Sequence, residues 1–485
     1  MGFRESKNFS LTSISSEIQD FWSKNDIFSK SFNKENSPHF IFFEGPPSAN
    51  GKPGIHHVMA RTIKDAFCRY KTLKGYNVKR KAGWDTHGLP VELGVEKELG
   101  ISKDDIGNKI SVSEYNAACK KAVMKYTAEW ESLTEEMGYW IDLSNPYVTY
   151  TSKYMETVWW LLKNISDKKL LYKGYTVQPY SPAAGTGLSS HELNQPGAYK
   201  DISDTSIIAQ FKCLDQGLPE ELKTFYPFYF LAWTTTPWTL PSNLALCVNE
   251  QLTYVKVRSI AENNVYIVAE ARLMQLFPAL RSKKLKTDSK AKIFEVLQFL
   301  PGTELVGRKY RPLFDCYNTA ERQNSAFKVI SDAYVSSDAG TGIVHQAPAF
   351  GEDDYRVCLE HGIIDVKKSG ESGDLPCPVD ANGRFTLPMS ADLLGVHVKN
   401  ADAAICATLK GKGRLVLKEA HEHSYPFCWR SDTPLIYKAV PSWFVAVESL
   451  KDKLIKNNAQ TYWVPDSVTV LCTNSSLDGL LPPNR

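Results

Sequence analysis

The chain has 485 residues, of which 43% are hydrophobic, 23% charged and 12% aromatic. Its 57 Lys and Arg residues barely exceed its 54 Asp and Glu residues. This composition excludes a polycation that coats nucleic acid and lacks the signature of a disordered chain. The length also exceeds what one hydrophobic core usually spans, so two or three domains are expected.

Membrane and secretory signals are missing from the sequence. No apolar run approaches the ~20 residues that span a bilayer. The first residues, MGFRESKNFSLTS, lack the apolar stretch of a secretory signal. Ten cysteines are scattered without a Cys-x-x-Cys pair, which is typical of buried thiols in a reducing compartment. We therefore expect a cytoplasmic protein, a monomer without a membrane partner.

The first elements follow a strand–loop–helix order. A helix is predicted over 13–28, and the side chains that share its apolar face are Ile14, Ile18, Phe21 and Trp22. A strand is predicted at Phe40–Phe43, followed by a glycine-rich loop over 45–54. The helix after that loop has an apolar face made of Met59, Ile63, Phe67 and Tyr70. This order predicts the first βα step of a nucleotide-binding α/β unit.

The pattern of predicted secondary structure changes twice after this βα step. A short strand is predicted over 76–82, and it leads into the loop GWDTHGLPVE at 83–92. From about residue 200 the pattern is one of short strands separated by turns: TSIIAQF, FYFLAW, LTYVKVR, NVYIVAE and GTGIVHQA. This pattern predicts a separate, mostly β domain. Over 410–444 the chain is expected to return to the first domain.

The loop EGPPSANGKPGIHH suits phosphate groups. A glycine-rich turn before a helix leaves free backbone N–H groups and the positive end of the helix dipole. Imidazoles at this position can donate hydrogen bonds to the phosphates of a nucleotide. The loop lacks the Gly-Lys-Ser/Thr ending of a P-loop. A satisfied structural histidine is the alternative for either imidazole alone, and the pair in one loop favours a nucleotide site.

These residues, followed by GWDTHGLPVE, resemble the catalytic start of the isoleucyl-tRNA synthetases, a family of class I enzymes. The resemblance implies an α/β fold: a Rossmann-like catalytic domain, here incomplete, with an inserted β-rich editing domain. It implies ATP with Mg²⁺, isoleucine and isoleucine tRNA as substrates. By the same resemblance Pro46 lines the isoleucine pocket, and Asp85 holds the substrate's α-ammonium by a charge-assisted hydrogen bond.

One departure from the family's pattern lies in the loop EGPPSANGKPGIHH, which we call the nucleotide loop. The family signature is His-x-Gly-His, and this chain has Gly54-Ile55-His56-His57. The resemblance therefore implies that His57, His56 and Gly54 are the catalytic residues. His57 keeps the last position of the signature, whereas the first His and the Gly of the signature have changed places, so that Gly54 comes first and His56 third. We expect that nucleotide still fits, because Gly54 relieves the crowding that His56 adds, and that adenylate-mimicking inhibitors bind less well.

Two motifs of the β-rich region, LAWTTTPWTLPSN and GTGIVHQAPAFGEDDY, resemble the halves of this family's hydrolytic editing pocket. The resemblance implies that Asp354 binds the α-ammonium and that His345 shapes the floor of the side-chain pocket. The residues expected around the ribose and the hydrolytic water are Thr234, Thr235, Thr236 and Asn243. A plain β-strand is the alternative for the three threonines, and a solvated acidic turn for the aspartates.

Some family members bind zinc through two Cys-x-x-Cys pairs. Here the corresponding places read Ser181-Pro-Ala-Ala184 and Cys428-Trp-Arg-Ser431, so no zinc is predicted. The predicted domains are 1–198 with the first half of the catalytic domain, 199–412 for editing, a return segment at 413–468 and a divergent tail at 469–485. The lysine loop of the KMSKS type is missing, and the run at 282–292 is interpreted as a solvated charge run.

The leading hypothesis is the N-terminal part of an isoleucine-tRNA ligase, with activation of isoleucine and charging of tRNA in the full-length enzyme and editing of valyl-tRNA. Without the lysine loop, this chain alone is expected to be inactive in adenylation. Two alternatives remain: a free-standing editing hydrolase with a vestigial nucleotide fold, and a non-catalytic tRNA-binding fragment. Pyrophosphate exchange and salt-dependent RNA affinity distinguish them.

Overall fold

The computed structural model describes residues 10–32, 36–42, 44–214, 227–278, 294–365, 375–463 and 467. The chain divides into two compact units, Met1–Lys169 and Leu170–Arg485. Each unit is described by itself below. The predicted charge run at 282–292 and the predicted tail at 469–485 lie outside the described residues.

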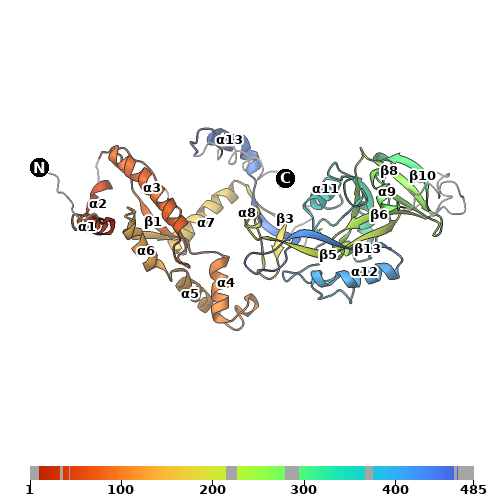
Figure 1. Cartoon of the computed structure of the whole chain (residues 1–485), viewed down its shortest axis with the longest axis horizontal. Coiled ribbons are helices and arrows are strands. Elements are labelled where there is room, and N and C mark those ends of the chain that lie inside the picture. The colour runs from red at the N-terminus through yellow and green to blue at the C-terminus, as the bar shows by residue number, and fades with distance from the viewer. Residues whose placement is uncertain are drawn as a thin grey trace. The chain divides into compact units, whose positions relative to one another are not determined.

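The first unit is mostly helical around one pair of strands (Figure 1). Its strands β1 (Lys81–Trp84) and β2 (Asp142–Val148) are parallel. Its helices are α1 (Leu11–Lys24), α2 (Ile27–Phe32), α3 (Ile55–Leu73), α4 (Leu89–Leu99), α5 (Val112–Val123), α6 (Thr127–Glu136) and α7 (Ser152–Asp167). The helix predicted over 13–28 is therefore divided between α1 and α2, because Asp26 takes a positive φ of 47°.

The strand predicted at Phe40–Phe43 is wrong for the residues that the structure describes. Residues 40–42 form no regular strand, and Phe43 lies outside the described residues. A single parallel bridge joins His39 to Asn77, where the Phe40 N–H donates to the Asn77 carbonyl at 3.1 Å. The apolar run still precedes the nucleotide loop, but one bridge is too little to define a strand.

Helix α3 forms as predicted, but its apolar stripe is exposed. Met59, Ile63 and Phe67 are 64%, 55% and 61% exposed. The buried positions of α3 are instead Arg61, Cys68 and Thr72. The apolar periodicity predicted the helix correctly, but the apolar face does not coincide with the face that packs inward in the described residues.

The second unit contains a six-stranded sheet with the order β10-β8-β9-β6-β5-β13 and two three-stranded sheets (Figure 1). Its strands are β3 (Leu171–Ser181), β4 (Thr186–Gly187), β5 (Tyr199–Lys212), β6 (Phe228–Thr234), β7 (Ala245–Val248), β8 (Thr253–Ser259), β9 (Asn264–Ala269), β10 (Phe294–Pro301), β11 (Lys328–Ser331), β12 (Val344–Gln346), β13 (Leu415–Pro426) and β14 (Ile436–Val445). Its helices are α8 (Ser190–Leu193), α9 (Leu273–Leu276), α10 (Ala320–Ser325), α11 (Glu352–Glu360), α12 (Asp402–Gly411) and α13 (Lys451–Asn458). The predicted β-rich region is confirmed, since all five quoted segments contain strands.

The division into units differs from the predicted domain boundaries. Strand β13 pairs with β5, and β14 pairs with β3, so residues 415–445 stay in the second unit. Strand β3 lies within the predicted first domain of 1–198 and β5 within the predicted editing domain, so the strand pairing does not settle the expected return over 410–444. The boundaries at 198/199 and 412/413 stay predictions for functional domains.

The main core of the second unit lies between the sheets, α11 and α12. It contains the fully buried side chains Phe211, Phe230, Leu244 and Tyr310. Close packing in this core holds in place the strands that carry residues of the two predicted editing motifs.

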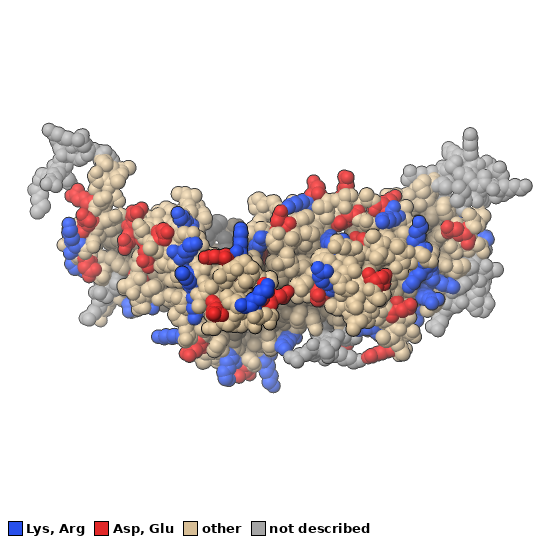
Figure 2. Space-filling model, turned by 90° about the horizontal axis from the view of Figure 1, so that it is seen from below, with Lys and Arg blue, Asp and Glu red and all other residues tan. Residues whose placement is uncertain are grey.

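None of the described helices is long and apolar enough to span a membrane. Acidic and basic side chains are interspersed on the face shown in Figure 2, as the near balance of charges predicts.

Candidate functional site

The nucleotide loop forms a cavity of about 470 Å³ at the start of α3. Its lining brings Pro46 and His57 together with Gly51, Lys52 and Lys64. Two lysines and a helix N-terminus give this cavity the electrostatics of an anion site. Lys64 Nζ, however, already pairs with Glu44 Oε1 at 2.6 Å. Arg61 also lines the cavity, where it donates to Thr134 Oγ1 and lies over the Trp130 ring, so Lys52 is the lysine better placed to meet a phosphate.

His57 is held in one tautomer by the backbone. Its Nδ1 accepts the Gly54 N–H at 2.9 Å, so a neutral ring carries its hydrogen on Nε2. Burial lowers the pKa of His57, and the charges of His56 and Arg61 lower it further. At neutral pH this imidazole therefore offers one Nε2–H donor rather than a positive charge.

His56 lies in close contact with both Gly54, the residue with which it is exchanged, and His57. The rings of His56 and His57 have centroids 3.7 Å apart. A Cβ added to Gly54 would lie 3.0 Å from His56 Cε1, which is tighter than ordinary van der Waals contact. Glycine at this position therefore leaves room for the His56 ring, and the fit of a nucleotide beside it stays a prediction. Gly54 and His56 are not among the residues that line the cavity.

Asp85 follows β1 and is joined to the same loop through the backbone. Its N–H donates to the Pro47 carbonyl at 3.0 Å, although its side chain does not line the cavity. Gly83, two residues earlier, is required by packing, because a Cβ there would lie 2.3 Å from the Tyr147 ring. The Tyr147 hydroxyl in turn donates to the Glu44 carbonyl at 2.8 Å.

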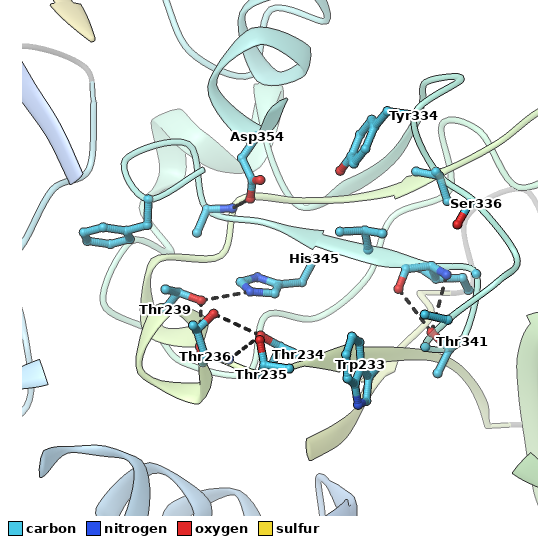
Figure 3. Close-up of a pocket in the computed structure, with 18 residues that line it drawn as sticks. Trp233, Thr234, Thr235, Thr236, Thr239, Tyr334, Ser336, Thr341, His345 and Asp354 are labelled. Atoms are coloured by element: carbon cyan, nitrogen blue, oxygen red, sulfur yellow. Dashed lines mark hydrogen bonds between the residues drawn. The ribbon is translucent and has the colours of Figure 1, made fainter. Parts of the chain in front are cut away.

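The second candidate site is a cavity of about 340 Å³ in the β-rich unit (Figure 3). Strand β6 and the turn after it supply the threonines from one side, and β12 supplies His345 from the other. The cavity is lined by Trp233, Thr234, Thr235, Thr236, Thr239, Tyr334, Val335, Ser336, Ala339, Gly340, Thr341, Gly342, Ile343, Val344, His345, Ala347, Phe350 and Asp354. The structure thus brings the two predicted motifs to one pocket.

A chain of hydrogen bonds orders the threonine side of this cavity (Figure 3). The hydroxyls of Thr234 and Thr236 lie 3.2 Å apart. Thr239 Oγ1 donates its hydrogen to the Thr236 carbonyl at 2.9 Å, so it accepts from His345 Nε2, also 2.9 Å away. His345 therefore carries its hydrogen on Nε2.

His345 is neutral in this position. Burial lowers its pKa to about 4, and its Nδ1 atom has no hydrogen-bond partner among the described residues. A neutral ring pinned by Thr239 acts as a fixed wall rather than as a general acid at neutral pH. This suits the role of a pocket floor.

Asp354 is a carboxyl group in an apolar setting at the start of α11 (Glu352–Glu360). Burial raises its pKa to about 7, which the Ala347 N–H partly offsets by donating to Asp354 Oδ1 at 2.6 Å. The neighbouring Asp353 pairs with Arg356 at 3.1 Å and keeps a side chain that is 39% exposed. Of the two aspartates, only Asp354 lines the cavity.

Asn243 is the predicted editing residue that the structure does not bring to the cavity. Its Oδ1 accepts the hydroxyl of the buried Tyr310 at 2.7 Å, and its Nδ2 donates to the Ala245 carbonyl at 2.8 Å. Sequence reasoning missed Thr239 and Thr341, although both lie inside the quoted motifs. It also missed Tyr334, for which the motifs gave no signal.

The two stretches that stand in place of the family's Cys-x-x-Cys pairs lie close together. Ser181 Oγ and Ser431 Oγ are 3.3 Å apart, and Cys428 is fully buried beside them. Hydrogen bonds from both serines help to lower the pKa of Cys428 against the effect of burial. Within the part of the chain that the structure describes, no three His, Cys, Asp or Glu side chains form a metal-binding group. One thiol among hydroxyls does not fit a structural zinc.

Comparison with known proteins identifies the class. The family described as "tRNA synthetases class I (I, L, M and V)" matches residues 17–475, and the chain belongs to it.

The individual relatives narrow the class further. The chain is 48% identical to "Isoleucine--tRNA ligase" of Bacteroides fragilis (strain YCH46) over 96% of its own length and 44% of the relative. It is 46% identical to "Isoleucine--tRNA ligase, cytoplasmic" of Mus musculus over 95% of this chain and 34% of that protein. The chain thus spans less than half the length of these relatives.

The chain also matches solved structures. "The crystal structure of GlLeuRS-CP1" is aligned with 44% of this chain and 98% of that chain at 16% identity, with a TM-score of 0.32. That score is too low to define a shared fold.

Proposed function

We propose that the chain serves isoleucine-tRNA ligation, in which the full-length enzyme activates isoleucine with ATP and Mg²⁺ and charges isoleucine tRNA. The β-rich unit removes valine from mischarged tRNA by hydrolysis. The names of the relatives favour isoleucine as the amino acid. A cytoplasmic monomer without bound zinc belongs to the same proposal.

The observation that carries the hydrolytic part is the cavity itself. Three threonines, a neutral His345 and a carboxyl group, Asp354, line one pocket of about 340 Å³. An aminoacyl ester needs an anion for its α-ammonium, donors and acceptors for its ribose and a positioned water. The cavity brings such groups together from β6 and the turn after it, from β12 and from α11.

A hydrolytic pocket is needed because one binding site discriminates only weakly between isoleucine and valine. One missing methylene is worth only ~1–3 kcal/mol of discrimination, and the isoleucine–valine pair is the standard example of that limit. A second site that admits valine and excludes isoleucine multiplies the selectivity. His345, fixed by Thr239, is the wall that excludes the larger side chain.

In the hydrolytic step, ionised Asp354 holds the α-ammonium and so orients the ester carbonyl toward the threonine side. The hydroxyls of Thr234, Thr235 and Thr236 bind the ribose hydroxyl and the attacking water. Water adds to the carbonyl carbon, the ester bond to the ribose oxygen breaks, and that oxygen takes a proton. The products are valine and uncharged tRNA.

In the first unit, Pro46 and Asp85 receive isoleucine, and the loop receives ATP. The His57 Nε2–H and Lys52 meet the phosphates at the N-terminus of α3. Gly54 and His56 shape the rim of this site rather than its wall.

Deacylation tests the proposal. The purified chain is incubated with isoleucine tRNA charged with valine or with isoleucine, and the remaining ester is measured over time. The valyl ester is expected to disappear and the isoleucyl ester to persist. Asp354→Ala is expected to abolish the valyl activity, and an unaffected variant would refute the site.

A further inference from the structure

The threonines of the hydrolytic cavity lead into a short 3₁₀ helix over Pro237–Ser242. Thr236 is the N-cap residue of this helix, and all six helical residues are buried. The first N–H groups of a helix have no acceptor inside the helix. A helix that starts in the interior therefore needs an acceptor from another part of the chain.

The N–H group that needs this acceptor is that of Trp238. Pro237 has no N–H group, and the Thr239 N–H donates to the Thr236 carbonyl at 3.0 Å. A threonine at the N-cap position ordinarily accepts the N–H of the second or third helical residue with its own hydroxyl. The side chain of Thr236 makes no such hydrogen bond here.

Asp402 supplies the acceptor instead. It is the first residue of α12 and follows Trp238 by 164 residues, and its Oδ1 accepts the Trp238 N–H at 3.0 Å. Burial raises the pKa of Asp402 to about 6, and the charge of Lys399 and the hydrogen bond to Trp238 partly offset this effect. The carboxyl group is therefore mainly ionised at neutral pH, and an ionised acceptor makes the stronger hydrogen bond.

The Thr236 hydroxyl is thereby left to the cavity (Figure 3). It lies 3.2 Å from the Thr234 hydroxyl, on the side of the cavity where the ribose and the attacking water lie in the proposed hydrolysis. To cap the Trp238 N–H, the Thr236 side chain would need a different χ1 rotamer, and its oxygen would leave this position. The acceptor on α12 and the position of the Thr236 hydroxyl are therefore coupled.

We propose that Asp402 is a positioning residue of the hydrolytic site, which caps the 3₁₀ helix in place of Thr236 and so keeps the Thr236 hydroxyl directed at the substrate. The proposal rests on the proposed hydrolytic function. Asp402 does not line the cavity, so it acts on the reaction only through the capped turn. The same turn presents Thr239 to His345 Nε2 at 2.9 Å.

Deacylation of valine-charged isoleucine tRNA measures the effect on the reaction. Asp402→Ala removes the acceptor, so the Thr236 hydroxyl is expected to turn to the Trp238 N–H. The value of kcat should fall on the order of 100-fold, as misplacing a reacting group by about 1 Å does, while KM changes little. Asp402→Asn keeps an acceptor oxygen and should recover most of this loss. Glu321→Ala is the matched control, because Glu321 is also an acidic residue in the first turn of a helix, α10, and does not line the cavity.

A double variant separates positioning from a general loss of stability. Thr236→Ala should lower the activity of the unmodified chain and should cost little further activity in the Asp402→Ala background, because the hydroxyl has already left the cavity there. Losses that multiply in the double variant would overturn the proposal. So would an Asp402→Asn variant as slow as Asp402→Ala, or an Asp402→Ala variant as fast as the Glu321→Ala control.

A measurement on the hydrogen bond itself keeps this inference distinct from the hydrolytic function. The sequence contains one Pro-Trp step, Pro237-Trp238. A chain labelled with ¹³C at the proline carbonyls and with ¹⁵N at tryptophan therefore gives a single signal for the Trp238 amide in a carbonyl–amide correlation spectrum. In the unmodified chain this signal is expected to shift with pH around a midpoint near 6, as Asp402 gains a proton, and in Asp402→Asn it is expected to stay in place.

The variant also controls for other titrating and charged groups around the cap. These groups are present in both chains: Asp204 of β5, Lys399, and Lys418 and His423 of β13. Equal behaviour of the Trp238 signal in the two chains would refute the cap, even if valyl esters were hydrolysed. A shift that is lost in Asp402→Asn would support the cap, even if no ester were hydrolysed.

Discussion

Replacing Asp354 by asparagine removes one negative charge from the hydrolytic cavity and keeps the shape of the side chain. The amide oxygen can still accept the Ala347 N–H, as Asp354 Oδ1 does at 2.6 Å. The lost interaction is a hydrogen bond between two charged groups, for which about 1.5–3 kcal/mol is typical. The expected loss in kcat/KM for valyl-tRNA is therefore roughly 10- to 160-fold, since each 1.4 kcal/mol is a factor of ten.

The pH profile gives the same residue a second signature. Burial raises the pKa of Asp354 to about 7, so its carboxylate form grows as pH rises through that value. The α-ammonium of the substrate loses its charge at higher pH, with a typical pKa of about 7.7–8.0. The unmodified chain should show a bell-shaped dependence of kcat/KM on pH. The Asp354→Asn variant should lose the rise on the acidic side of that curve. His345 adds no limb there, because burial lowers its pKa to about 4.

The assay is single-turnover deacylation of valine-charged isoleucine tRNA between pH 5.5 and about 9, with Asp353→Asn as the control. Asp353 is the adjacent aspartate, with a 39% exposed side chain paired to Arg356. A parent-like profile in Asp354→Asn, or an equal loss in Asp353→Asn, would refute the assignment of the ammonium site.

At pH 8 the Asp354→Asn variant should be more stable to unfolding than the unmodified chain, although it is less active. The folded-state pKa of Asp354, about 7, lies above the ordinary value of 3.8 for an aspartate. Between these values the folded state binds the extra proton, so this group makes folding less favourable as pH rises from about 4 to about 7. Asp354→Asn should therefore unfold at a higher temperature than the parent at pH 8, and the difference should vanish near pH 4. A lower Tm for the variant at pH 8 would contradict the desolvated carboxyl.

Three further changes test other parts of the account. His345→Ala removes the pocket floor and should allow hydrolysis of isoleucyl-tRNA, which the parent spares; continued rejection of the isoleucyl ester would show that another wall sets the limit. The double exchange Gly54→His with His56→Gly should tighten the binding of adenylate-mimicking inhibitors, and unchanged inhibition constants would show that the exchanged order does not matter. Gly83→Ala places a Cβ 2.3 Å from the Tyr147 ring and should destabilise the protein by about 1–3 kcal/mol, as overpacking does; urea unfolding measures this, and an unchanged midpoint would contradict the packing.

The secondary structure of the β-rich unit could be predicted well, because short runs rich in β-branched and aromatic residues alternate with turn residues, and most of these runs are buried on both faces. The first unit was harder. The stripe of Met59, Ile63 and Phe67 predicted α3 but not its buried face, which carries Arg61 over the Trp130 ring at 4.9 Å. Periodicity registers apolar spacing and cannot register a buried cation stacked on an aromatic ring.

The candidate site was predictable where its residues lie inside contiguous motifs. The threonine run, His345 and Asp354 were found in this way and line one cavity. Asn243 was assigned by the same motif, yet its side chain is occupied by Tyr310. Tyr334 lies in a turn between β11 and β12, outside both motifs, and only the folded chain brings it to the cavity.

The most direct test of the central claim is a competition in one reaction. Isoleucine tRNA charged with labelled valine and the same tRNA charged with differently labelled isoleucine are mixed with the purified chain, and both esters are followed together. The account predicts rapid release of valine while the isoleucyl ester decays at its rate without protein. Equal release of both amino acids, or release of neither, would contradict a valine-selective hydrolytic cavity.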